Sequence, residues 1–202
     1  SWSPGADIDL SGTSTANIDA TGAVMFSGEA GVHVVNGALS INADSVSMGD
    51  GNASNGAILT STGSGTVTVT STGGNISFGL QAVNAGSANV QLTSAGAISD
   101  ASGTADSIIT TGDVLLSATG GDIGATGAGA IDVDITGGGT LSASATGSDV
   151  FITSDSNLTV ASITTAAGAD TVQISTTSTA TLDLTGTGGY TNIASDNFDL
   201  DT

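Results

Sequence analysis

The sequence predicts an all-β protein whose short strands stack as the coils of a parallel β-solenoid. Three observations favour this fold. Apolar residues alternate with polar ones over short stretches, glycine-rich turns separate these stretches, and similar stretches recur along the chain. Helix-favouring residues are nearly absent, because the 202 residues include 31 glycines, no lysine or arginine, and Glu29 as the one glutamate.

The alternating stretches define the expected strands. Each contains β-branched or aliphatic residues at every second position, as in a strand with one buried face. In chain order we expect strands at 66–70, 89–92, 113–117, 130–135, 149–152, 157–160, 171–174 and 181–184. Glycine pairs or triplets interrupt the pattern at 73–74, 120–121, 137–139 and 188–189, where we expect turns.

The spacing of the strands indicates a repeat. The second residues of the strong strands are Val67, Val90, Val114, Val150 and Val172, so the gaps are 23, 24, 36 and 22 residues, and the longest gap contains the strand at 131–135. A unit this short buries its apolar face only by stacking on its neighbours. At about 22 residues per coil and ~4.8 Å per coil, the chain predicts roughly nine coils and a rod of roughly 43 Å.

We expect one solenoid domain over 1–202, with the clearest repeats at 60–185 and less regular coils at 1–60. A narrow solenoid interior suits Val, Ile, Leu and Ala and leaves little room for aromatic side chains. The rival all-β fold is a sandwich, whose core usually contains a large aromatic residue. Trp2 and Tyr190 lie near the ends of the sequence instead, which favours the solenoid.

The charge composition excludes several functions. With no lysine or arginine and a net charge of −19, the chain lacks the basic surface that binds nucleic acid or anionic membranes. With no cysteine and one histidine, it has neither a thiol nucleophile nor a zinc site of two or three histidines. No apolar run approaches the ~20 residues of a membrane span, so we expect no membrane insertion.

Aspartate supplies all but one of the acidic residues. Its short side chain bonds nearby backbone amides, so we expect most aspartates in turns or on the outer face, and we expect the carboxylates of Asp132 and Asp134 to point outward. Because no cation of the chain offsets the charge, salt or divalent cations should stabilise it. The candidate calcium ligands are Asp50, Asn52, Asp196 and Asp199, which lack the spacing of an EF-hand.

Catalysis is not expected, and we identify no catalytic residue and no cofactor other than the calcium considered above. His33 alternates with the valines around it, so we expect it at an outward or corner position. A carbohydrate-binding or carbohydrate-hydrolysing β-helix remains an alternative, because paired carboxylates hydrolyse glycosides without lysine or arginine. Aromatic residues, which commonly support sugar rings, make up 3% of the chain.

Segments 89–100, 112–124 and 139–160 carry a family resemblance. Their degenerate units resemble the repeats of filamentous haemagglutinin-like giant secreted bacterial proteins, and the resemblance covers about residues 60–185. It implies a right-handed parallel β-helix, secretion across an outer membrane, and an adhesive or matrix role. The first residues show no signal peptide, so we expect that a signal, if the protein is secreted, lies upstream or has been removed.

The function expected from these observations is a non-enzymatic, adhesive rod, a segment of a larger protein outside the cell or on a bacterial surface. Its partners would be neighbouring repeats of the same chain and host or matrix glycans. The alternative within this class is a filament subunit that stacks end to end, because a solenoid exposes strand edges at its ends. Trp2, Tyr190 and Phe198 are the candidate contact residues for such stacking.

Overall fold

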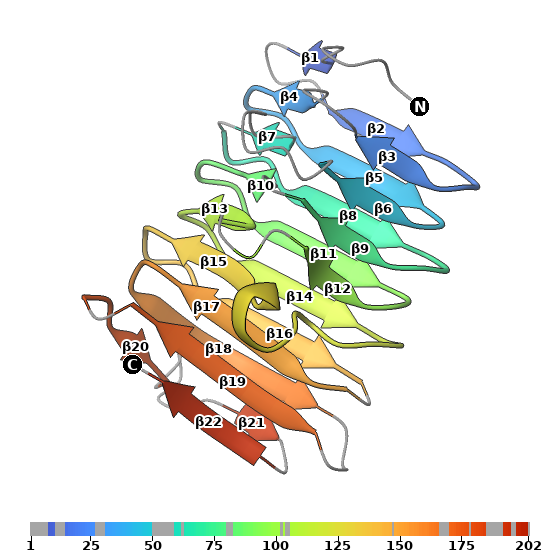
Figure 1. The fold of residues 1–202 in the computed structure, drawn as a ribbon. Helices are drawn as coiled ribbons and strands as arrows, with labels where there is room; N and C mark the ends of the chain where they lie inside the picture. Colours follow the sequence, from blue (N-terminus) through green and yellow to red (C-terminus); the bar gives the residue numbers. More distant parts are fainter. Residues whose placement is uncertain are drawn as a thin grey trace.

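The computed structural model shows an all-β parallel β-solenoid, as the sequence predicts (Figure 1). Successive coils stack along one axis, from β1 at one end to β22 at the other. The structure describes residues 8–10, 15–26, 31–49, 59–61, 63–79, 83–101, 103, 106–146, 148–165, 170–177, 179–184, 192–194 and 197–201, with backbone alone for 59–61, 192–194 and 197–201.

Three sheets make up the walls of the solenoid, and all their strand pairs are parallel. The first sheet contains β1 (Ile8–Leu10), β4 (Val32–Val34), β7 (Leu59–Ser61), β10 (Val83–Asn84), β13 (Ile108–Thr110), β15 (Ile131–Ile135), β17 (Val150–Ser154), β19 (Thr171–Thr176) and β22 (Asn197–Asp201), in this order.

The second sheet contains β2 (Ala16–Asp19), β5 (Leu39–Ala43), β8 (Val67–Ser71), β11 (Val90–Ser94), β14 (Val114–Ala118), β16 (Leu141–Ala145), β18 (Leu158–Thr165) and β20 (Leu182–Asp183), with β21 (Asn192–Ala194) also paired to β18. The third contains β3 (Val24–Phe26), β6 (Val46–Met48), β9 (Ile76–Phe78) and β12 (Ile98–Asp100). A short 3₁₀ helix, η1, covers Gly127–Gly129.

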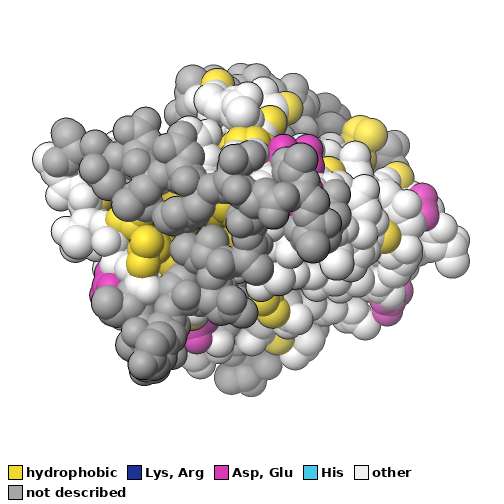
Figure 2. All heavy atoms as spheres, turned by 90° about the horizontal axis from the view of Figure 1, so that it is seen from below, with side chains coloured by type: hydrophobic (Ala, Val, Ile, Leu, Met, Phe, Trp, Pro, Cys, Tyr) yellow, Lys and Arg dark blue, Asp and Glu magenta, His cyan; other side chains and the backbone are white. Residues whose placement is uncertain are grey.

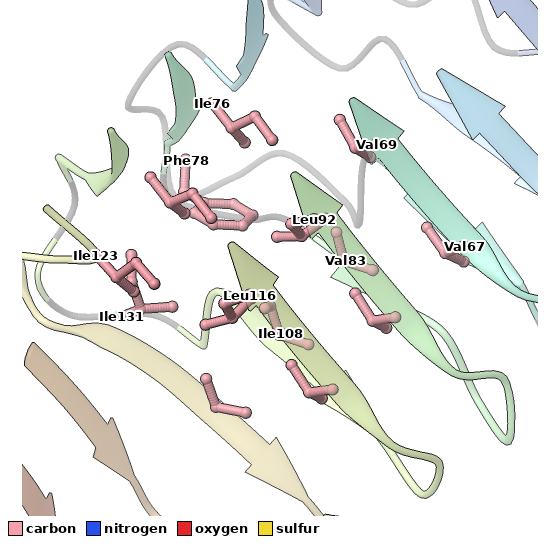
Figure 3. Packing of buried hydrophobic residues seen from close by; sticks show 14 of the residues in the cluster. Val67, Val69, Ile76, Phe78, Val83, Leu92, Ile108, Leu116, Ile123 and Ile131 are labelled. Carbon is pink, nitrogen blue, oxygen red and sulfur yellow. The ribbon is translucent and has the colours of Figure 1, made fainter. Parts of the chain in front are cut away.

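The core is a continuous column of aliphatic side chains between the three sheets. In the second sheet, Val69, Leu92 and Leu116 occupy the same position on successive strands and are fully buried. Figure 3 shows them side by side, together with Ile76 and Phe78 of the third sheet. Alternation places every second residue of these strands inside, which is the pattern that the sequence analysis used to find them.

Aromatic side chains do enter the core, contrary to the expectation from its narrow interior. Phe26, Met48 and Phe78 lie at one position of the third sheet on β3, β6 and β9, and each is at most 2% exposed. The next residue in this column is Asp100, which is 8% exposed and accepts a hydrogen bond of 2.5 Å from the Ser107 hydroxyl. The third sheet ends at this coil, so the wall changes where the column changes from apolar to acidic.

The coils are fewer than the nine predicted, because most contain more than 22 residues. Val67, Val90 and Val114 do align in the second sheet, as the repeat predicts. Val150 and Val172 align with each other but lie in the first sheet, and the partner of Val114 on the next coil is Leu141. The gap of 36 residues therefore joined positions on two different walls. Coils also form within residues 8–61, the part predicted to be less regular.

Candidate functional site

Carboxyl groups from three consecutive strands of the first sheet meet on the outside of the solenoid. Asp132 lies on β15, Asp106 precedes β13, and Asp155 follows β17. Pairing of β15 with β13 and β17 brings the three together, and a carboxylate oxygen from each lies within 4.8 Å of the others. We call these three residues the acidic cluster. They are the one such group among the residues that the structure describes.

Asp132 is the most perturbed member of the acidic cluster. Alternation directs it away from the core, as predicted, but its side chain is half-buried rather than solvated. Burial raises its pKa to about 7, and the negative charges of Asp134, Asp106, Asp155 and Asp100 raise it further in that order of importance. Its Oδ1 atom is buried and has no hydrogen-bond partner.

The pKa of Asp106 is raised for the same reasons. Burial is the largest cause, followed by the charges of Asp134 and Asp155. The chain has no lysine or arginine, so no cationic side chain of either type opposes this shift. The acidic cluster therefore favours the uptake of a proton, which would remove one of its mutually repelling charges.

Asp134 lies beside the acidic cluster but has a different environment. One oxygen, Oδ1, accepts hydrogen bonds from the Ser154 hydroxyl at 3.3 Å and from the backbone amides of Asp155 and Ser156, both at 3.0 Å. These bonds join β15 to the turn after β17. Asp134 therefore acts as a structural link between coils, whereas Asp132, two residues earlier, has an oxygen with no donor.

The acidic cluster can share a proton between carboxyl groups, and its spacing is also compatible with a shared cation. Calcium takes six to eight oxygen ligands, whereas the cluster supplies three carboxylates. We therefore assign no metal ligands here. Paired carboxyls with different proton affinities are also the arrangement that glycosidases use as acid and nucleophile.

Aspartate and asparagine side chains also form a ladder between coils at the positions that precede strands. Their Oδ1 atoms accept backbone N–H bonds from the equivalent position of the next coil. These bonds join Asn75 to Ala97, Asn89 to Asp113, Asp113 to Thr140, Asp122 to Asp149, Asp149 to Thr171 and Asn157 to Thr181, over 2.6–3.1 Å. The sequence analysis expected bonds to nearby amides, but the donors in this ladder lie 22–27 residues further along the chain.

The outward face of the second sheet is polar and uncharged along its middle strands. One row contains Ser40, Thr68, Gln91, Leu115 and Ser142, which pair in register on β5, β8, β11, β14 and β16. The parallel row contains Asn42, Thr70, Thr93, Ser117 and Ser144. We call these two rows the polar face. In Figure 2, which views the molecule from below, acidic side chains appear as separate points on a largely uncharged surface.

His33 lies on the outward side of β4, as predicted, and is half-buried. Its Nδ1 atom is 3.3 Å from Oδ1 of Asp9, its partner on β1, and both side chains are substantially exposed. This is an isolated surface pair with no nucleophile placed beside it by any described contact. It links the first two coils of the described chain.

The predicted calcium ligands and assembly contacts fall outside the described side chains. Asp50, Asn52, Asp196, Trp2 and Tyr190 are not among the described residues. Phe198 and Asp199 belong to β22, where their backbones pair with Val172 and Gln173, and their side chains are not described. The structure therefore brings together none of these residues, and the predictions about them stand as predictions.

Sequence reasoning singled out Asp132 but missed Asp106 and Asp155, its partners 26 and 23 residues away. The signal was present, because each lies beside a strand of a neighbouring coil. Using it required the correct alignment of β13, β15 and β17, and the valine repeat did not provide this alignment.

Comparison of the chain with protein-family models, with curated proteins and with solved structures finds no match to any of them. Within the described residues, no helix has the length and apolar character needed to cross a bilayer.

Proposed function

We propose that this chain is a non-enzymatic structural and adhesive segment of a rod-shaped, secreted bacterial surface or matrix protein. The observation that carries the proposal is the parallel, in-register stacking of nine strands in the first sheet and eight in the second. Each coil supplies backbone bonds and a layer of core to the next, so the architecture extends along one axis without a change of design.

The surface supports an adhesive role for this rod. The polar face presents hydroxyl and amide groups at the regular spacing of a parallel sheet, about 4.8 Å between strands. Its middle strands, from β5 to β16, have no acidic residue in either row. Such a face offers hydrogen-bond donors and acceptors to a neutral glycan without the repulsion that the acidic turns would cause.

Protease resistance tests the rod itself. Trypsin has no lysine or arginine to cleave, so the assay uses proteinase K, which has broad specificity. The intact chain should survive under conditions that degrade the Leu116→Ala variant, because Leu116 is fully buried in the core. Equal and rapid cleavage of both chains at many positions would contradict a stably stacked rod.

Adhesion is tested with beads that carry the chain and are applied to arrays of host and matrix glycans. A variant with Thr68→Asp, Gln91→Asp and Ser142→Asp adds three charges to the polar face and should lose binding. The control adds two charges at Gly22 and Gly138, where a side chain meets nothing within 4 Å, and should keep it. Equal binding by both variants would remove the polar face from the proposal.

Two observations distinguish this function from its alternatives. A parent reading frame many times longer than this chain supports a rod segment, whereas end-to-end filaments of the isolated chain in electron micrographs favour a filament subunit. The second candidate is carbohydrate hydrolysis, favoured by the carboxylates of the acidic cluster and the raised pKa of Asp132. Release of reducing sugars that Asp132→Asn abolishes would establish it.

A further inference from the structure

The acidic cluster spans two contacts between coils, which couples its charge to the stacking of the solenoid. Asp106 belongs to the level of β13, Asp132 to β15 and Asp155 to β17. The Ser107 amide donates to the Asp132 carbonyl at 3.1 Å, and Asp132 pairs with Thr153 of β17. Repulsion among the three carboxylates therefore acts directly against these backbone contacts.

The charged groups that face Asp132 are all acidic. They are Asp134 on its own strand, Asp106 beside β13, Asp155 beside β17 and Asp100 on β12. Asp134 and Asp100 each accept a hydrogen bond from a serine hydroxyl, but the buried Oδ1 of Asp132 accepts none. An ionised Asp132 is thus desolvated without a compensating partner, whereas a protonated one has lost the charge that made burial costly.

We propose that Asp106, Asp132 and Asp155 form a proton-operated clasp between three coils, which holds the coils together when it has bound a proton and loosens them when all three carboxyls are ionised. The clasp concerns the stability of the solenoid, so the inference does not depend on the proposed adhesive function.

The direction of the pH effect follows from the pKa of Asp132. In the folded chain this pKa is about 7, whereas an unfolded aspartate has a pKa of about 3.9. Between these values the folded state holds a proton that the unfolded state has released. The free energy of unfolding therefore falls as the pH rises from about 4 to about 7, and the dependence ends above the folded pKa.

The experiment measures urea unfolding between pH 5 and pH 8, at constant ionic strength and with a chelator present. All variants carry His33→Gln, which removes the one imidazole of the chain. We expect the unfolding equilibrium constant to rise at least about tenfold from pH 5 to pH 8, which allows for the screening of a half-exposed carboxyl. Asp132→Asn should lose most of this dependence and exceed the parent in stability at pH 8.

Two controls separate the clasp from general charge and from misfolding. Asp19→Asn removes one charge from an exposed position on β2 and should leave the pH dependence unchanged. Asp106→Asn and Asp155→Asn keep Asp132 but remove a repelling neighbour, so carboxyl NMR should show the Asp132 titration moving to lower pH. The clasp is refuted if the parent and Asp132→Asn share one pH dependence, or if no aspartate of the parent titrates between pH 5 and pH 8.

Discussion

Leu116 and Leu115 are adjacent on β14 and provide a matched test of the core. Leu116 is fully buried, whereas Leu115 is 40% exposed on the polar face. Replacing each by alanine removes the same atoms from the same strand. The difference between the two variants therefore reports which face of β14 packs inside, with no change in helix or strand propensity between them.

The structure sets the expected magnitude for Leu116→Ala. Its neighbours in register are Leu92 on one side and Ala143 on the other. Truncating a buried leucine costs about 2–5 kcal/mol, and more where the surroundings collapse poorly into the cavity. Because Ala143 is too small to fill the space, we expect about 4 kcal/mol. Leu115→Ala should cost less than about 1 kcal/mol, as for other exposed positions.

Thermal unfolding followed by far-UV circular dichroism measures both variants. For a chain of this length, 1 kcal/mol shifts the melting temperature by about 2–4 °C, so Leu116→Ala should melt roughly 8–16 °C below the parent. Leu115→Ala should remain within about 4 °C of it. Equal shifts, or a larger shift for Leu115→Ala, would refute the alternation of inward and outward positions on which the fold rests.

Three further predictions use the same assay. Gly139→Ala should cost about 1–3 kcal/mol, because its Cβ would overlap the Gly112 carbonyl of the preceding coil, while Gly138→Ala, with open space around it, should be neutral or slightly stabilising; equal effects would contradict this stacking of turns. Asp113→Ala should cost about 1 kcal/mol through the loss of its bond to the next coil, and Asp113→Asn, which keeps an acceptor oxygen, should restore most of that stability. Adding salt should raise the melting temperature of the parent, because it screens a net charge of −19, and an unchanged or lower value would show that self-repulsion is unimportant.

Much of the fold is legible in short stretches of sequence. The alternation Thr66-Val67-Thr68-Val69-Thr70 is enough to place its valines inside and its threonines outside, because side chains along a strand point to opposite faces. The same reasoning placed Asp132 outward. It did not predict that the carboxyl would be half-buried, because the groups that crowd it come from the coils before and after.

The alignment of the coils is where the sequence reasoning failed. Val67, Val90 and Val114 share a wall, but continuing the repeat to Val150 moved the alignment to another wall. Coils differ in length at their turns, and a degenerate repeat of small residues does not show where the additional residues lie. The count of nine coils was too high for the same reason.

The sequence by itself determined the class of fold and the uncompensated negative charge, since both follow from residue types and local alternation. Only the tertiary structure decided which aspartates meet. Asp106, Asp132 and Asp155 become neighbours through the pairing of β13, β15 and β17, and the Oδ1 atoms of the ladder find their donors on the next coil. Contacts of this kind join residues more than 20 positions apart, so they depend on the register between coils, which no single stretch of the chain encodes.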